Sequence, residues 1–445
     1  MPELLVDTKQ AALPAQSVGT LPQKIILGAI LGIVAGTIFG PRTAMLQSIG
    51  NAYGAMLQIA VFPYILCSLM YGLGRLHPAT AQKMLRAGWL PFLFLWILTF
   101  STIWLLAFAI PPVRSSAALA AAPAHDSIAL IDLLIPSNPF TALRKNYVPA
   151  VVIFAVLYGI ALQKIASKQT LLEVLNAISI ASVAIWNWVV KLAPFGVFAL
   201  LATTTGTVRP DRLIGLIVYM CLYLAGTAIL ALLVIPITLS AIVPESYREL
   251  LRKFRPAMVL GVGTTLSVAA LPLVQKAAES VLERAGCPAS EERSSLVQTS
   301  LSLSYVFAQL GNLFVYLLIL YSSYEEHLSL TLAKKIALPV MTLLSCLGSP
   351  SATYDSVDFL SGWLHLPSTV FNLYVETSAI TRFGQVLLSI SGFSFVTVAI
   401  PLLYFKKAQL HPWRFLAGII SCAALCTCLV AGATLFRNVL FPAAE

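Results

Sequence analysis

The sequence predicts an all-α polytopic membrane protein. Of its 445 residues, 58% are hydrophobic and only 10% are charged, whereas soluble domains carry roughly 25% charged residues. Apolar runs of about 18 residues or more, long enough to cross a bilayer as helices, recur from Lys24 to Phe441. This composition excludes a soluble enzyme, a disordered chain and a disulfide scaffold. The net charge of +10 does not indicate nucleic-acid binding, because Lys and Arg gather in the cytoplasmic loops of membrane proteins.

Hydropathy predicts a series of spans along the chain. They lie near 24–40, 50–74, 88–112, 147–166, 174–203, 213–242, 296–322, 369–404 and 413–441. Two further segments, 256–280 and 335–364, carry turn residues inside apolar flanks. If the N-terminus is cytoplasmic and both segments return to the side from which they entered, most Lys and Arg face the cytoplasm. This bias follows the positive-inside rule, so we expect two re-entrant hairpins.

The two turn-containing segments place small and polar residues at membrane depth. They read AMVLGVGTTLSVAALP at 257–272 and SCLGSPSAT at 345–353. Non-helical backbone is tolerated there only if it is buried in protein or lines a wet cavity, and paired broken segments point to a transporter's binding site. We therefore expect substrate-binding residues at both tips, with two kinked helices as the alternative. The candidates are Thr264, Thr265, Ser267, Gly348, Ser349, Pro350 and Ser351.

Two of the predicted spans carry polar residues three and four positions apart, which places them on one helical face. The stripe in 296–322 consists of Ser302, Tyr305, Gln309, Asn312 and Tyr316, and that in 369–404 of Ser378, Arg382, Gln385 and Ser389. Polar side chains are costly against lipid, so both stripes should face protein or water. An intramembrane Arg is functional by default, which makes Arg382 the strongest candidate for binding substrate. The alternative is a structural Arg that binds loop carbonyls or Glu376.

Four stretches carry a resemblance to a known family. They read KIILGAILGIVAGTIFG at 24–40, LQIAVFPYILCSLMYGL at 57–73, NPF at 138–140 and KLAPFGVFAL at 191–200. With the two hairpins, they resemble the dicarboxylate/amino acid:cation symporter family, which contains the glutamate transporters, over about residues 22–405. The resemblance implies eight core transmembrane helices and two re-entrant hairpins. It also implies a homotrimer in the cell (inner) membrane and a transport domain that moves like an elevator.

The resemblance also divides the chain. Residues 1–22 would form a cytoplasmic tail, 23–405 the symporter core, and 406–445 an extra transmembrane helix and tail, with an amphipathic surface tail as the alternative. Within the core, the scaffold would comprise roughly 23–75 and 146–203. The mobile transport part would comprise roughly 86–112, 213–242 and 253–405.

The candidate site departs from the family's pattern. The family's NMDGT sodium motif is replaced here by Ala308, Gln309, Leu310, Gly311 and Asn312. In the last core helix, Ser378 replaces the family's first acid, Arg382 its amino-group Asp, Gln385 its substrate Arg, and Ser389 and Phe393 its sodium-binding Asn and Asp.

These substitutions predict a change of substrate and of coupling. Hard cations need oxygen ligands, so the loss of both sodium-site carboxylates argues against ordinary sodium coupling. A guanidinium in place of the amino-group Asp argues against an amino acid substrate, and it can bind a carboxylate in a bidentate pair. We therefore expect a secondary transporter for a small organic anion such as a dicarboxylate.

Proton coupling would need a titratable group, for which Glu376, Asp355 and Asp358 are the candidates. A carboxyl buried in apolar surroundings has a raised pKa and can carry a proton near neutral pH. The alternatives are a helix-start acid near solvent for Glu376 and an outer-face or salt-bridged position for the two Asp residues. The sequence predicts no catalytic residues, metal site or cofactor. The expected partners are the anionic solute, protons, the lipid bilayer and further copies of the chain. Two other readings stay open: a non-transporting sensor or scaffold, and a sodium-coupled amino acid symporter.

Overall fold

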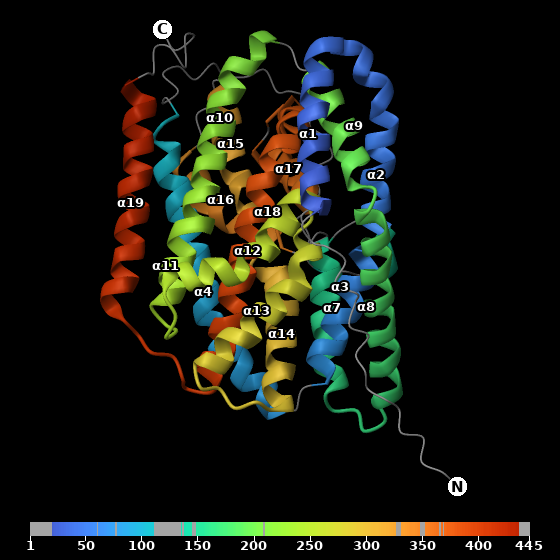
Figure 1. Ribbon diagram of the computed structural model, residues 1–445, viewed down its shortest axis with the longest axis vertical. Helices are drawn as coiled ribbons and strands as arrows, with labels where there is room; N and C mark the ends of the chain where they lie inside the picture. The colour runs from blue at the N-terminus through green and yellow to red at the C-terminus, as the bar shows by residue number, and fades with distance from the viewer. Residues whose placement is uncertain are drawn as a thin grey trace.

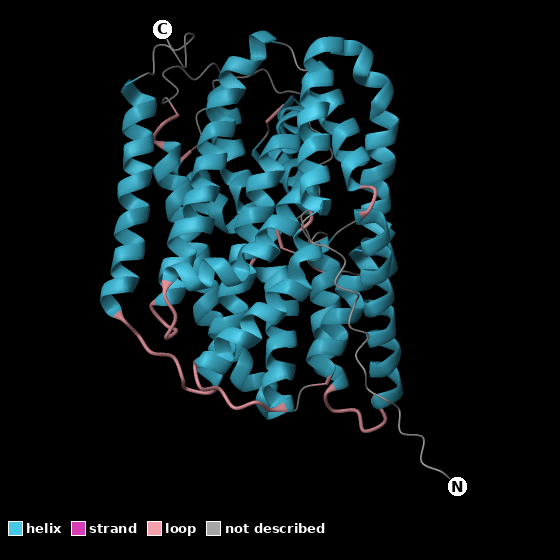
Figure 2. Cartoon of the chain, viewed as in Figure 1, coloured by secondary structure: helices cyan, strands magenta, loops and turns pink. Residues whose placement is uncertain are grey.

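The computed structural model describes residues 20–59, 61–75, 78–110, 135, 138–144, 148–207, 210–325, 331–347, 352–364, 366–367 and 369–435. These residues are almost entirely helical, and no strand occurs among them (Figure 2). In chain order the elements are α1 (Thr20–Phe39), η1 (Gly40–Leu46), α2 (Gln47–Ile59), α3 (Val61–Gly74), α4 (Pro78–Ala107), α6 (Pro139–Arg144), α7 (Val148–Leu162), α8 (Gln169–Val190), α9 (Ala193–Thr207), α10 (Pro210–Ala228), η2 (Ile229–Val234), α11 (Ile235–Ser240), α12 (Tyr247–Thr264), η3 (Ser267–Ala270), α13 (Leu271–Arg284), α14 (Glu291–Phe307), η4 (Leu310–Phe314), α15 (Val315–Glu325), α16 (Leu332–Ser345), α17 (Ala352–Leu364), α18 (Thr369–Tyr404) and α19 (Pro412–Leu435).

Five helical segments are long and apolar enough to cross a membrane. They are Gly88–Ala107, Leu216–Ser240, Glu292–Tyr324, Ile380–Tyr404 and Pro412–Leu435. These segments confirm the prediction of an all-α polytopic membrane protein. The count of eight core transmembrane helices stays a prediction.

The predicted span 174–203 is divided between α8 and α9. At the break the chain turns at Lys191 and Leu192, and Pro194 follows in the first turn of α9. Proline has no amide hydrogen to continue the ladder of a preceding helix, so it is suited to the start of a new one. Lys191 is exposed at this break.

The helices contact one another in two sets (Figure 1). In one set α1 and α2 pack against α9, and α3 packs against α7 and α8. In the other set α18 lies at the centre and contacts α4, α10, α12, α13 and α14. The sets touch chiefly where α1 meets α12 and where α3 meets α14. Helix α18 therefore lies deep in the protein, and the candidate residues along it are surrounded by other helices.

The first turn-containing segment forms a helical hairpin of α12 and α13. Helix α12 ends at Thr264, and the backbone of its capping residue Thr265 is left-handed, with φ 56°. The Leu266 amide donates to the Gly261 carbonyl at 3.0 Å and the Thr265 amide to the Val262 carbonyl at 3.2 Å, which is the pattern of a Schellman helix end. The chain then re-enters helix through η3, so a real turn lies at the predicted tip.

The second segment likewise gives two helices in contact, α16 and α17. Its predicted tip residues Gly348, Ser349, Pro350 and Ser351 lie outside the described residues. That both hairpins leave the membrane on the side from which they enter it stays a prediction.

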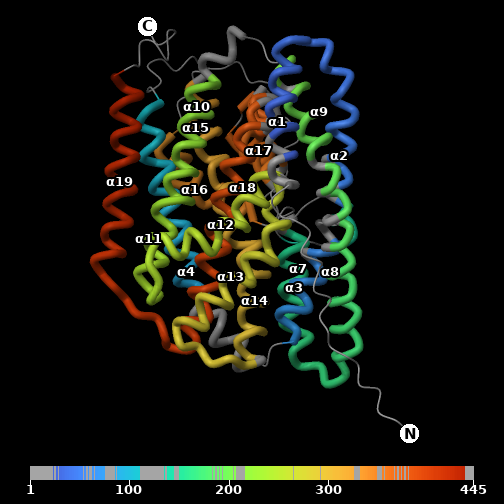
Figure 3. Tube along the Cα trace, in the orientation of Figure 1, coloured from blue at the N-terminus to red at the C-terminus, as the bar shows by residue number. Residues whose placement is uncertain are grey.

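Helix α19 packs onto the set around α18, against α4, α11 and the π-helical turn η2 (Figure 3). Two hydrogen bonds hold the segment that connects α18 to α19. The Gln409 amide donates to the Ile242 carbonyl at 3.2 Å, and the His411 amide donates to the Ala241 carbonyl at 2.8 Å. The sequence prediction of an additional apolar helix here agrees with the described helix to Leu435.

Candidate functional site

A buried network of side-chain amides joins four elements near the centre of the helix bundle. The Gln385 Nε2 of α18 donates to the Asn312 Oδ1 of η4 at 2.8 Å. The Asn312 Nδ2 donates to the Cys346 carbonyl at the end of α16 at 3.2 Å. The Gln309 Nε2 donates to the Ser267 Oγ of the first hairpin at 3.2 Å. All four polar side chains are at most 4% exposed, so the network ties both hairpins to α18.

The network exists because the predicted helix 296–322 is broken. Helix α14 ends at Phe307, and Ala308 and Gln309 leave helical geometry before η4 begins. Two distant side chains satisfy carbonyls near the break. The Trp96 Nε1 donates to the Phe307 carbonyl at 2.8 Å and the Tyr223 hydroxyl to the Gly311 carbonyl at 3.1 Å. The expectation of one continuous polar face was therefore wrong, although all five residues of that stripe are buried.

Gly311 allows the backbone at the helix break to lie directly against α18. A Cβ at this position would overlap the backbone of Gln385. The Gly311 amide donates to the Ser389 Oγ at 3.4 Å, and the Ser389 Oγ donates to the Gln385 carbonyl at 2.8 Å. Ser389 thus positions the two elements rather than pointing into free space.

Arg382 lies one turn before Gln385 and is surrounded by tyrosines. Its guanidinium carbon is 6.0 Å from the centre of the Tyr354 ring, which in turn packs edge-on against Tyr374 at 5.1 Å. Its Nε is buried and has no hydrogen-bond partner. No acid among the described residues forms an ion pair with it. A guanidinium in this state has donors to offer, and a carboxylate is the group that their fork geometry fits.

The network also holds an unused acceptor. The Gln309 Oε1 is buried without a partner, although the Nε2 of the same amide is bonded to Ser267. Buried polar groups in folded proteins are hydrogen-bonded in the great majority of cases. The Arg382 donor and the Gln309 acceptor are two of the eight buried side-chain N and O atoms without a partner among the described residues.

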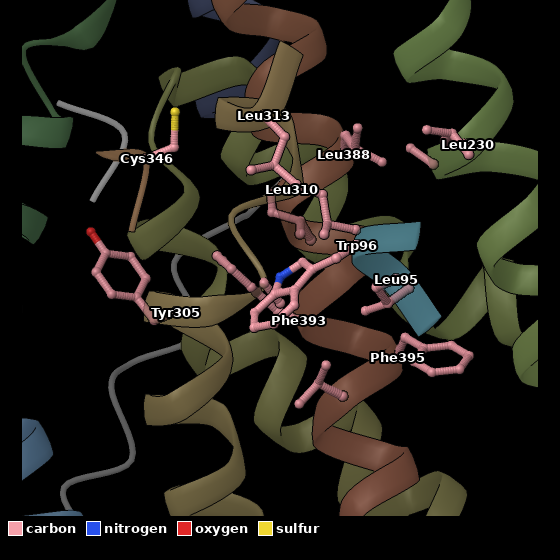
Figure 4. Close-up of a cluster of buried hydrophobic side chains, with 14 of the residues drawn as sticks. Leu95, Trp96, Leu230, Tyr305, Leu310, Leu313, Cys346, Leu388, Phe393 and Phe395 are labelled. Carbon is pink, nitrogen blue, oxygen red and sulfur yellow. The ribbon is translucent and has the colours of Figure 1, made fainter. Parts of the chain in front are cut away.

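Apolar side chains fill the two positions where the family resemblance implied sodium-binding carboxylates. Leu310 and Phe393 are both 0% exposed. Figure 4 shows them in one cluster with Trp96 and Leu388, and the Phe393 ring lies 5.9 Å from that of Tyr305. Among the described residues no group of three His, Cys, Asp or Glu side chains could hold a metal ion.

The remaining candidates lie apart from the network or outside the described residues. The side chains of Thr264, Asp355 and Glu376 belong to the undescribed part. Thr265 is half-buried at the hairpin turn, and Asp358 is exposed on α17.

Sequence reasoning missed Cys346 and the tyrosines around Arg382. Tyr374 precedes Ser378 by one turn, so extending the stripe along α18 would have found it. Tyr53, Tyr223 and Tyr354 come from three other helices, and nothing in their spacing links them to Arg382.

The model of the sodium:dicarboxylate symporter family matches residues 21–400. The chain belongs to this family. Its members are transporters and not enzymes, so the protein is a multi-pass membrane transporter of a dicarboxylate/amino acid:cation symporter type. The match ends within α18, and α19 lies beyond it.

Proposed function

We propose that the protein carries a small organic anion across the membrane and that Arg382 binds its carboxylate. One observation carries the proposal: the Arg382 Nε is buried without a partner next to the amide network. Leaving a buried donor unsatisfied costs about 1–3 kcal/mol or more for a charged group. A bound carboxylate would remove that cost by accepting parallel hydrogen bonds from the guanidinium.

The proposed transport is not coupled to sodium in the family's usual way. Leu310 and Phe393 have no oxygen atoms in their side chains to offer, and both are packed in the apolar core. Hard cations need several oxygen ligands, and these two side chains supply none. Proton coupling through Glu376 or Asp355 is part of the same proposal.

We also infer an elevator movement within a homotrimer, in which the set of helices around α18 moves relative to α1, α2 and α9. Support comes from the packing, because each set is in closer contact within itself than with the other. The substrate residues Gln309, Asn312 and Arg382 would travel together, since all belong to the set around α18.

Ligand-dependent thermal unfolding of the purified protein tests this function. A panel of organic anions and amino acids is compared in sodium and in potassium buffers, and uptake of the stabilising anion is then measured in proteoliposomes. Ligand at about 100 times its dissociation constant stabilises by about 2.7 kcal/mol. We expect an anion to raise the unfolding temperature equally in both buffers.

Variants of Arg382 test whether this residue causes the rise in unfolding temperature and the uptake. Arg382→Ala should abolish the shift and the uptake, and Arg382→Lys should weaken both, because an ammonium is a point charge without the bidentate fork. Arg75→Ala is the matched control, since Arg75 is a half-buried Arg bonded to Gln298 away from the network. A shift with amino acids that requires sodium would refute the proposal.

A further inference from the structure

The stretch of chain that contains Arg382 carries very little positive charge. Between Arg293 and Lys406 the sequence has only three Lys or Arg residues, namely Lys334, Lys335 and Arg382. The two lysines lie in the first turn of α16, where Lys335 is exposed. Since a helix rises about 1.5 Å per residue, Lys335 is about 16 Å along the axis from the end of α16 that meets the network. Arg382 is therefore the only Lys or Arg of this stretch that lies outside the first turn of α16.

The surroundings of Arg382 are aromatic rather than charged. The Tyr354 ring centre lies 6.0 Å from its guanidinium carbon and packs against Tyr374, and Tyr53 and Tyr223 are near enough to influence its charge. These four tyrosines come from α2, α10, α17 and α18, so both sets of helices contribute. Rings of this kind offer apolar faces and phenolic hydroxyls but no full charge.

Tyr53 is the member of this group with an unused hydroxyl. Its side chain is 2% exposed, and its OH is buried without a hydrogen-bond partner. Gly196 of α9 allows the ring to lie against the α9 backbone, because a Cβ there would overlap it. Tyr53 forms a small apolar cluster with Val189, Val197 and Leu201, and Leu266 of the first hairpin and Phe383, next to Arg382, pack against that cluster. The Tyr53 side chain thus belongs to a cluster that the hairpin tip and α18 both contact.

We propose that the site selects a singly charged carboxylate with an apolar body, and that the Tyr53 hydroxyl donates a hydrogen bond to the carboxylate held by Arg382. This inference rests on the proposed function and specifies its substrate class. One guanidinium neutralises one carboxylate. A second carboxylate on the same molecule would be buried among tyrosine, leucine and phenylalanine side chains without a counter-ion, which is strongly unfavourable. An apolar body in its place gains contact with the rings.

Ligands of similar size that carry one or two carboxylates test the effect of a second charge on binding. Binding of butyrate, monomethyl succinate, benzoate and succinate to the purified full-length protein is measured by calorimetry in sodium-free buffer of neutral pH. Both carboxyl groups of succinate are then ionised, as carboxyl pKa values near 4 require. Monomethyl succinate has nearly the length of succinate but one charge. We expect the three monocarboxylates to bind at least tenfold more tightly than succinate.

Tyr53→Phe tests the role of the hydroxyl. The change should weaken monocarboxylate binding about tenfold, the usual size of one hydrogen bond to a charged group. It should leave the unfolding temperature of the unliganded protein unchanged or higher, because the OH has no partner to lose. A merely structural tyrosine would show the opposite pattern. Tyr316→Phe is the control, since Tyr316 is buried but not among the tyrosines that interact with Arg382.

The outcomes separate this inference from the proposed function. If succinate binds more tightly than monomethyl succinate and the binding is lost in Arg382→Ala, the selection for one charge is overturned and anion transport stands. If monocarboxylates bind equally to the wild type and Tyr53→Phe, the role of Tyr53 is overturned. If no anion binds in an Arg382-dependent way, the proposed function itself fails.

Discussion

Replacement of Leu310 by Asp tests the claim that apolar packing has closed the position of a sodium ligand. Leu310 is 0% exposed, so losing its burial costs about 1.5–3 kcal/mol. Full burial raises the pKa of a carboxyl by up to about 3–5 units. From an unfolded value near 3.9, keeping that group neutral near pH 7.5 costs about 4–5 kcal/mol. The total of about 6–8 kcal/mol is comparable with the whole stability of many proteins.

The sign of the pH dependence follows from linkage. Burial raises the pKa of the introduced carboxyl in the folded state, so Leu310→Asp loses stability as the pH rises above the unfolded pKa. Lowering the pH from about 7.5 to about 5 should therefore restore about 3 kcal/mol of its free energy of unfolding. Thermal unfolding in detergent measures this, in sodium and in potassium buffers. Leu310→Asn is the control, because it loses the same burial without a titratable group. A Leu310→Asp protein with wild-type stability near neutral pH, raised by sodium but not potassium, would refute the argument from apolar packing.

Three other changes have effects that thermal unfolding can measure. Gly311→Ala should cost about 1–3 kcal/mol because its methyl group would overlap the α18 backbone. Gly432→Ala on α19, where nothing lies within 4 Å, should cost nothing, and equal losses at both sites would contradict the packing described. Thr265→Gly should raise the free energy of unfolding by about 0.5–1 kcal/mol, because the relief of left-handed strain exceeds the extra chain entropy that glycine loses on folding. A lower free energy of unfolding would show that the threonine side chain matters more. Ser246→Ala should cost about 1 kcal/mol by removing the cap of α12. Hydrogen bonds from Ser246 lower the pKa of Glu249. The stability difference between Ser246→Ala and the wild type should therefore shrink as the pH falls through the lowered pKa of Glu249. A difference that does not change with pH would contradict the capping box.

Features encoded by a continuous local pattern could be predicted from the sequence. The predicted span 369–404 coincides with α18, and the run at 413–441 covers all but the first residue of α19. Apolar length and the turn residues of 256–280 were sufficient, because a helix and its end are set by neighbours a few residues away. The residues Gln309, Asn312 and Gln385 were found in the same way, since polar residues in an apolar helix have few other places to go.

The break at Ala308 and Gln309 could not be predicted in this way. The polar spacing through 302–316 fits an unbroken helix, and the sequence has no proline there. The break is stabilised from a distance, by Trp96 of α4 and Tyr223 of α10, which bond the carbonyls on either side of it. Such partners depend on how helices far apart in the chain pack, which a local pattern does not contain.

Unpaired polar atoms lie beside the bonded amide network. A network that only holds helices together gains most when every buried donor and acceptor is bonded. Here the Asn312 and Gln385 amides, which join η4 to α18, are bonded to each other. Eight buried side-chain atoms lack hydrogen-bond partners among the described residues, and three of them, Arg382 Nε, Gln309 Oε1 and Tyr53 OH, belong to the proposed site. The other five are on Glu245, Ser300, Ser322, Thr342 and Thr397. Under the proposed function a bound carboxylate accepts hydrogen bonds from Arg382 and Tyr53, which is how that proposal accounts for two unpaired donors beside a satisfied framework.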